Sequence, residues 1–95
     1  MALLTSGEIE QALAGMPGWE RVGDAIVRQF SLDGGFMGSV GFVNRLAEAA
    51  EAADHHPDLV IAWNRVTVTL ATHSQGGITE KDIALARQAD LLAAA

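Results

Sequence analysis

The sequence predicts an α+β domain: a four-stranded antiparallel sheet with helices packed on one face, in the order α-β-β-α-β-β-α. Two observations predict this class. Segments in which apolar residues alternate occur in pairs, and segments with helical spacing lie before, between and after the pairs. The chain of 95 residues is also too short for two hydrophobic cores, so we expect a single domain over residues 1–95.

The first half predicts a helix and two strands. Thr5 lies three residues before Glu8, as in a capping box, and apolar residues follow at helical spacing. Residues 19–32 then predict two short strands on either side of a turn at Gly23-Asp24.

A second helix is predicted from Phe36. Its apolar stripe recurs at steps of three and four residues, with Phe42 and Leu46 broadening it: Phe36, Val40, Val43, Ala47 and Ala50. The pattern fades at Asp54, and Pro57 disfavours helical geometry at His56. We therefore expect the helix to end beside the two adjacent histidines.

The second half predicts two more strands and a last helix. Residues 59–63 and 65–73 are joined by a turn at Asn64, and in the second segment Val66, Val68 and Leu70 share one face. A strand that continued to His73 would place that imidazole on the polar face. Thr79 is the predicted N-cap of a helix that follows it.

Composition excludes several classes of function. The formal net charge is −6, from twelve acidic and six basic residues, which argues against a nucleic-acid partner. Without cysteine, the chain cannot form disulfides or use thiolate chemistry. No apolar run approaches the roughly 20 residues of a membrane span, and the first ten residues do not resemble a signal peptide. We expect a cytoplasmic protein with no membrane partner, whose small core is supplemented by self-association.

The candidate chemistry centres on three histidines, His55, His56 and His73. Imidazole ionises near neutral pH, so each could serve as an acid or a base. The residues alone leave other interpretations open: solvated loop histidines, or a three-histidine zinc site, although the spacing matches no common zinc motif.

Acidic and aromatic residues around the histidines have both structural and functional interpretations. Glu51 lies four residues before His55, so on a continuing helix its carboxylate could orient that imidazole or remain solvated. Asp54 could cap the helix or stay in water, and Asp82 suits the first turn of the last helix. Trp63 could be a core residue, an interface residue or the wall of a ring-binding pocket.

Taken together, the pattern resembles that of the pterin-4a-carbinolamine dehydratase family. The residues that fall at the family's signature spacings are Glu51, His55-His56-Pro57, Trp63, His73 and Asp82. The resemblance extends over residues 10–90 and includes "AIVRQF" at 25–30 and "THSQGGITEKDIALA" from Thr72. Leu59 and Ser74 depart from it, since many members have an aromatic residue and an aspartate there.

The resemblance implies dehydration of 4a-hydroxytetrahydrobiopterin to the quinonoid dihydropterin in tetrahydrobiopterin recycling, with no metal and no organic cofactor. It implies that His55 and His73 exchange protons with the substrate, that His56 binds the pterin and that Glu51 fixes an imidazole. The remaining residues that it implies for substrate binding are Asp54, Pro57, Trp63, Thr72 and Asp82.

The resemblance also implies partners. Family members form homodimers and homotetramers, and the pathway links them to an aromatic amino acid hydroxylase. Other members act without catalysis, as dimerisation cofactors of a transcription factor or as assembly factors, so an interaction protein of the same fold is the alternative prediction.

Overall fold

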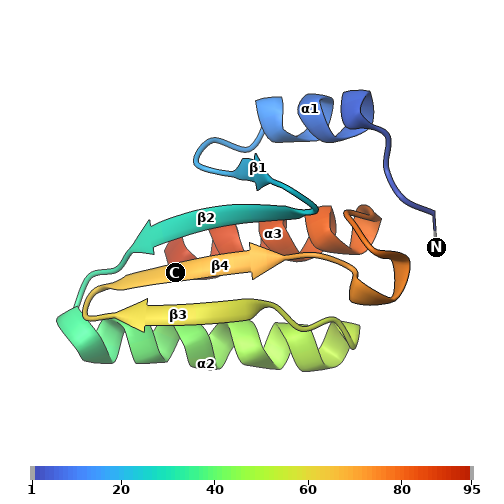
Figure 1. Cartoon of the computed structure of the whole chain (residues 1–95). Coiled ribbons are helices and arrows are strands. Elements are labelled where there is room, and N and C mark those ends of the chain that lie inside the picture. The colour runs from blue at the N-terminus through green and yellow to red at the C-terminus, as the bar shows by residue number, and fades with distance from the viewer. Residues whose placement is uncertain (1, 95) are drawn as a thin grey trace.

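The four strands form one antiparallel sheet in the order β1-β2-β4-β3 (Figure 1), which confirms the predicted fold class. The computed structural model describes residues 2–94. Its helices and strands are α1 (Ser6–Ala14), β1 (Glu20–Val22), β2 (Ala25–Ser31), α2 (Gly35–Ala53), β3 (Asp58–Ala62), β4 (Arg65–Leu70), a 3-10 turn η1 (His73–Gln75) and α3 (Glu80–Ala94).

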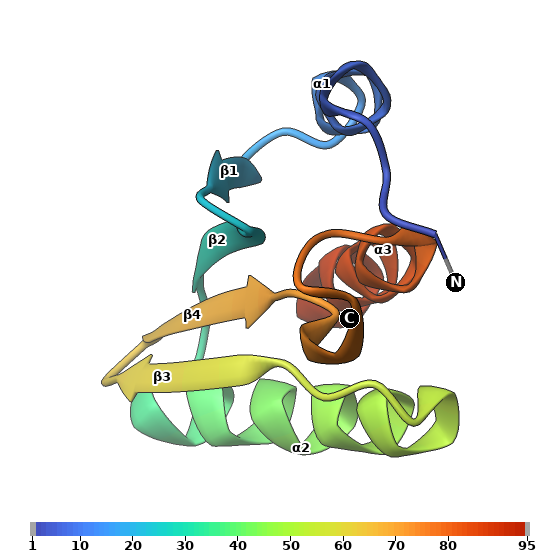
Figure 2. The same cartoon turned by 45° about the vertical axis from the view of Figure 1, so that its right-hand side comes forward.

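Helices α2 and α3 lie on the same face of the sheet and pack against each other (Figures 1 and 2). Helix α1 lies at the opposite edge of the molecule from α2, beyond β1. One core joins all three helices to the strands, and Ile9, Phe42 and Ile83 are its contributions from α1, α2 and α3.

The register of the strands places apolar residues in cross-strand pairs on the covered face. Ile26 lies opposite Leu70, and Phe30 lies opposite Val66. All four are buried, as the alternating pattern of β4 predicts. Strand β3 is one of the two edge strands, and most of its residues are exposed.

The first helix begins as predicted. The Glu8 N–H donates to Thr5 Oγ1 at 3.1 Å, and the Thr5 N–H donates to Glu8 Oε1 at 2.8 Å. These reciprocal bonds form the capping box and satisfy donors that a helix N-terminus otherwise leaves free.

The predicted apolar stripe of α2 was wrong at Phe36 and Ala47 but is confirmed at Ala50 and at the two residues that broaden it, Phe42 and Leu46. Phe36 is 53 % exposed and Ala47 is exposed, whereas the buried residues of the helix are Ser39, Phe42, Leu46 and Ala50. The buried face contains a serine because Ser39 Oγ donates to the backbone oxygen of Trp63 at 2.5 Å. Because this buried serine has an internal hydrogen-bond partner, the pattern of apolar residues alone does not show which face of α2 packs on the sheet.

Strand β4 ends at Leu70, so the conditional prediction of a strand reaching His73 was wrong. The chain instead folds back on itself at Thr72. The backbone oxygen of Thr72 accepts the Gln75 N–H at 2.9 Å and the Gly76 N–H at 3.0 Å. His73 is therefore the first residue of a 3-10 turn, and no strand fixes the direction of its side chain.

None of the helices among residues 2–94 is both long enough and apolar enough to cross a membrane.

Candidate active site

The site forms where α2 ends. Asp54 adopts the left-handed conformation with φ 50°, and its N–H donates to the Glu51 oxygen at 3.2 Å. The next N–H, of His55, donates to the Ala50 oxygen at 3.0 Å. The helix ends beside the histidines as predicted, and Pro57 then leads directly into β3 at Asp58.

His55 turns into the protein, where it meets Asp82 of α3. His55 Nε2 lies 2.5 Å from Asp82 Oδ1, and their side chains are 9 % and 0 % exposed. A carboxylate on one ring nitrogen fixes the tautomer and the orientation of an imidazole. The contact therefore engages Nε2 of His55 and orients its ring.

The second oxygen of Asp82 is held by two threonines. Oδ2 accepts the hydroxyl of Thr72 at 2.8 Å and the backbone N–H of Thr79 at 2.9 Å. The two threonine hydroxyls lie 2.7 Å apart, and both residues are buried. With His55 Nε2, the buried carboxylate of Asp82 thus has three hydrogen-bond donors. Buried carboxylates in proteins typically have partners of this kind.

The donors and acceptors of this cluster allow one consistent order. Because the Thr72 hydroxyl donates to Asp82, the Thr79 hydroxyl must donate to Thr72. Thr79 Oγ1 in turn accepts the N–H of Lys81 at 3.2 Å. A chain of hydrogen bonds therefore connects the first turn of α3 to the imidazole of His55.

Thr79 is the residue that the sequence analysis missed as part of the site. It was predicted as an N-cap, and its bond to Lys81 confirms that role. Asp82 lies in the first turn of α3 as predicted, and the same carboxylate accepts the Thr79 N–H and contacts His55 Nε2. The sequence did contain a signal for this association: Asp82, three residues after the predicted N-cap Thr79, also belongs to the family pattern.

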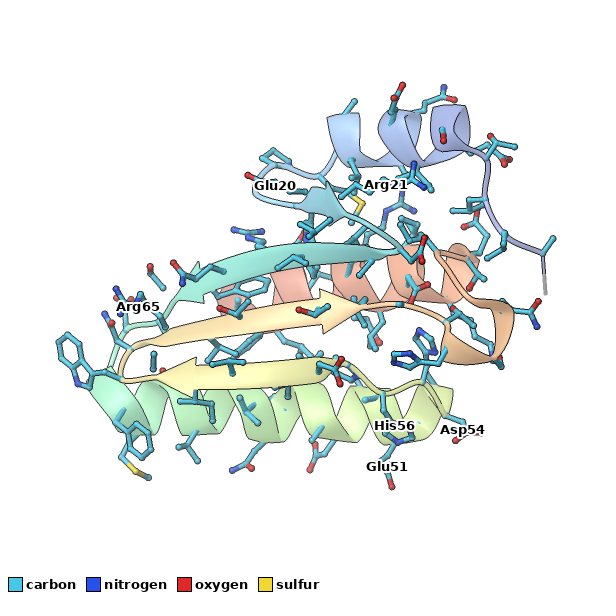
Figure 3. The ribbon with its side chains drawn as sticks, in the orientation of Figure 1. Glu20, Arg21, Glu51, Asp54, His56 and Arg65 are labelled. Atoms are coloured by element: carbon cyan, nitrogen blue, oxygen red, sulfur yellow. The ribbon has the colours of Figure 1, made fainter. Side chains whose placement is uncertain are left out.

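Glu51 pairs with His56 and not with His55, which corrects the pairing expected from a four-residue spacing. Glu51 Oε2 contacts His56 Nε2, and Figure 3 shows the two side chains together on the outer side of the end of α2. The pair is exposed, with side chains 75 % and 57 % accessible. The expectation failed because the helix ends at Asp54, so His55 does not continue its helical face.

The other predicted residues are divided between the site and the opposite end of the molecule. His73 is exposed and follows Thr72, so it lies next to the buried cluster in the chain. Asp54 is exposed at the end of α2, near Glu51 and His56 in Figure 3, and Pro57 is half-buried.

Trp63 is not brought to this site. It follows the last residue of β3, at the end remote from His56, and Arg65 beyond it lies at the far end of the sheet in Figure 3. Its indole lies against the start of α2, where a Cβ on Gly35 would be 3.4 Å from Trp63 Nε1. Within one chain, Trp63 therefore does not lie beside the histidines.

Within residues 2–94, no group of three His, Cys, Asp or Glu side chains is disposed to hold a metal ion. His55 contacts Asp82 and His56 contacts Glu51, so the two histidines and their carboxylates form two separate pairs.

Known proteins resemble this chain both in sequence and in fold. Residues 2–92 match the family model described as pterin 4 alpha carbinolamine dehydratase. The chain belongs to this family. A relative from Mycobacteroides abscessus, named "Putative pterin-4-alpha-carbinolamine dehydratase", is 53% identical over 90 residues, which cover 95% of each chain. One of the same name from Thermosynechococcus vestitus is 56% identical, over 88% of this chain and 87% of its own.

Solved structures agree on the fold. A transcriptional coactivator/pterin dehydratase from Brucella melitensis has a TM-score of 0.92 and 44% identity, covering 97% of this chain and 99% of its own. A pterin dehydratase-like protein described as a RuBisCO assembly factor has a TM-score of 0.64 at 22% identity, covering 79% of this chain and 86% of its own. The second likeness supports the fold alone.

Proposed function

We propose that the protein dehydrates a pterin 4a-carbinolamine, 4a-hydroxytetrahydrobiopterin, to the quinonoid dihydropterin and water. The observation that carries the proposal is the buried His55–Asp82 pair at the end of α2, with His73 following Thr72 of the same cluster. Membership of the dehydratase family supports the substrate class.

The reaction needs two proton transfers. One proton goes to the departing 4a-hydroxyl, which leaves as water, and the proton on ring nitrogen 5 is removed as the bond from carbon 4a to nitrogen 5 becomes double. Imidazoles suit both transfers near neutral pH. His55, through Nδ1, and His73 are the two groups that we assign to these transfers, and the sequence of events requires no metal or organic cofactor.

The remaining site residues bind and orient. His56, held by Glu51, contacts the pterin, and Asp54 and Pro57 shape the entrance beside it. Asp82, Thr72 and Thr79 act through His55 as positioning residues, because their hydrogen bonds reach the substrate only through its ring.

The activity is tested with purified protein and freshly generated carbinolamine, in the presence of EDTA. We expect acceleration over the uncatalysed dehydration, and we expect His73→Ala to lower the rate at least about 10²-fold, as for loss of a general acid or base. Failure of the wild-type protein to accelerate dehydration would reject the enzyme in favour of the alternative below.

The alternative is a non-catalytic dimerisation or assembly cofactor, or a transcriptional coactivator. One observation favours an interaction role: apolar side chains are exposed near the edge strand β3 and the start of α2, namely Phe36, Met37, Val60, Ile61 and Trp63. Exposed apolar surface of this kind is typical of protein interfaces. The same surface supports a homodimer or homotetramer, which sedimentation equilibrium measures directly.

The chemistry of the substrate and product indicates which reactions precede and follow the proposed dehydration. A quinonoid dihydropterin must be reduced before reuse, and the carbinolamine is formed by an oxygenase that hydroxylates an aromatic ring with a tetrahydropterin. We therefore propose a role in tetrahydrobiopterin recycling, linked to an aromatic amino acid hydroxylase and carried out in the cytoplasm.

A further inference from the structure

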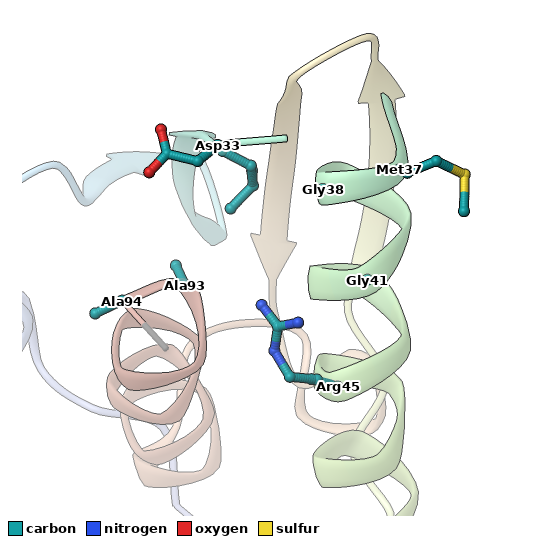
Figure 4. A pocket seen from close by; sticks show the side chains of 8 residues that line it. Asp33, Met37, Gly38, Gly41, Arg45, Ala93 and Ala94 are labelled. Carbon is teal, nitrogen blue, oxygen red and sulfur yellow. The ribbon is translucent and has the colours of Figure 1, made fainter. Parts of the chain in front are cut away.

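The two ends of α3 have different surroundings. Its last turn, at Ala93 and Ala94, borders a cavity of about 360 Å³ that also faces the first half of α2 (Figure 4). Its first turn is enclosed, since Thr79, just before the helix, and Asp82 are both 0 % exposed. The enclosed end is the one that contacts His55, so the residues that enclose it bear on the candidate site.

The segment before α1 reaches the enclosed end of α3. Figures 1 and 2 show this segment running from α1 to the loop between β4 and α3. The Leu4 N–H donates to the backbone oxygen of Ile78 in that loop at 2.9 Å. A Cβ on Gly77 would lie 3.0 Å from Leu3 Cδ2, so the Leu3 side chain lies directly against the buried Gly77. Leu3 and Leu4 form a strap across the loop.

One peptide group joins the strap to the buried cluster around His55. The oxygen of Ile78 accepts the Leu4 N–H. The N–H of the same peptide group belongs to Thr79 and donates to Asp82 Oδ2 at 2.9 Å. Asp82 Oδ1 in turn contacts His55 Nε2. Because hydrogen bonds in series polarise one another, the Leu4 N–H supports a chain of bonds that ends at the imidazole.

The strap also borders the loop that carries His73. Thr72 and Gly77 close this loop as an antiparallel bridge, in which the Thr72 N–H donates to the Gly77 oxygen at 2.8 Å. Leu4 bonds to the next residue, Ile78. His73 is exposed, so we expect its position to depend on this closed loop.

Helix α1 fixes the other end of the strap. Its capping box begins at Thr5, directly after Leu4, and its Ile9 is buried in the core. Arg21 Nη1 donates to Ser6 Oγ at 3.1 Å, which joins α1 to β1. The strap is therefore held on both sides and can restrain the loop that it crosses.

We propose that Leu4, through its backbone N–H, is a positioning residue for the Asp82–His55 pair. Its effect on catalysis rests on the proposed dehydratase function, whereas the positioning itself rests on the hydrogen bonds alone. Because the donor is a backbone N–H, no side-chain pattern in the sequence indicates this role.

Three variants isolate the donor. Leu4→Pro removes it, since proline has no N–H, and leaves the oxygen of the buried Ile78 without a partner. Leu4→Ala shortens the same side chain and keeps the N–H. Ala2→Pro is the proline control, because the Ala2 N–H makes no hydrogen bond within residues 2–94.

The test is NMR of the full chain labelled with ¹⁵N. In Leu4→Pro we expect the Thr79 N–H to exchange with solvent at least about tenfold faster than in the wild type, the effect of losing about 1.4 kcal/mol of local stability. The ring ¹⁵N signals of His55 should shift, while those of His56, which is paired with Glu51, stay unchanged. Leu4→Ala should accelerate exchange less than about threefold, and Ala2→Pro not at all.

Gly77→Ala displaces the strap without a proline. Its Cβ would meet the end of the flexible Leu3 side chain, so this variant should fold even where Leu4→Pro does not. We expect Thr79 exchange at least about twofold faster, and a second change, Leu3→Ala, should relieve most of this acceleration because it removes the atom that the new Cβ meets.

Unchanged Thr79 exchange in a folded Leu4→Pro, or in Gly77→Ala where the proline variant does not fold, would overturn the proposal. Equal acceleration at Thr79 and at the amides of β4 would also overturn it, because the loss of stability would then be general. Carbinolamine turnover separates this proposal from the dehydratase proposal. With an active wild type, kcat should fall at least about threefold in Leu4→Pro with little change in KM, and an unchanged kcat would contradict positioning for catalysis. An inactive wild type would reject the dehydratase, and the exchange rates would still decide the role of Leu4.

Discussion

The two adjacent histidines form carboxylate pairs of the same chemistry in opposite environments. His55 meets Asp82 in the interior, where their side chains are 9 % and 0 % exposed. His56 meets Glu51 on the surface, where both are more than half exposed. Solvent screens the second pair and permits it to rearrange, whereas the first is held by additional donors. The comparison indicates that His55 is the positioned imidazole of the site.

One residue produces this separation. Asp54 ends α2 in a left-handed conformation, so the chain changes direction just before the histidines. Successive side chains then point to different sides, and Pro57 prevents the helix from resuming. Breaking either pair therefore tests a different part of the account.

The largest expected effect on stability is that of Asp82→Ala. It leaves the Thr79 N–H, the Thr72 hydroxyl and the His55 ring without their acceptor. We expect the free energy of unfolding to fall by about 3 kcal/mol, because a buried donor left without its acceptor costs about 1–3 kcal/mol. Urea denaturation monitored by circular dichroism measures the change.

Glu8→Ala is the matched control for Asp82→Ala, because Glu8 makes the same bond to an N-cap residue on the exposed helix α1. It should cost about 1 kcal/mol or less. Equal losses in the two variants would contradict a special contribution from the buried cluster.

A smaller effect is expected of Thr79→Ala, which removes the hydroxyl that donates to Thr72 and caps α3. Stability should fall by about 1 kcal/mol. If Thr79 positions His55 through Thr72 and Asp82, kcat for dehydration should also fall several-fold, and Thr79→Ser should restore it.

A purely structural cap would change the unfolding midpoint and leave kcat unchanged well below that midpoint. That outcome for Thr79→Ala would remove Thr79 from the site.

The smallest effect is expected of Glu51→Gln. An exposed ion pair contributes at most about 1 kcal/mol, which corresponds to a factor of about five in rate. We expect kcat/KM to fall by less than that factor, with a difference that shrinks as salt is added. A loss approaching that of a catalytic histidine would show that the exposed pair, and not the buried one, organises the site.

The fold was predictable because its signals are local. Capping at Thr5, the turn at Gly23-Asp24 and the alternation of β4 each depend on a few neighbouring residues, and the structure confirms them. The stripe of α2 was wrong in part, at Phe36 and Ala47, because the buried face includes Ser39, whose partner, the backbone of Trp63, is remote in sequence.

The sequence named the residues of the candidate site but not their pairings. The family resemblance named Glu51, His55 and Asp82 as candidate site residues, but assigning their partners required knowing that α2 ends at Asp54. Spacing along the chain likewise gave no direction for Trp63, which the full length of β3 carries away from His56.

The most direct test of the account is the kcat for carbinolamine dehydration by His55→Gln and His55→Ala. Glutamine can still donate to Asp82 and so preserves the buried cluster, but it cannot exchange a proton near neutral pH. We predict a fall of at least about 10²-fold in both variants, the low end for general acid–base catalysis. Unchanged turnover would contradict the assignment of His55 as a proton-transfer group.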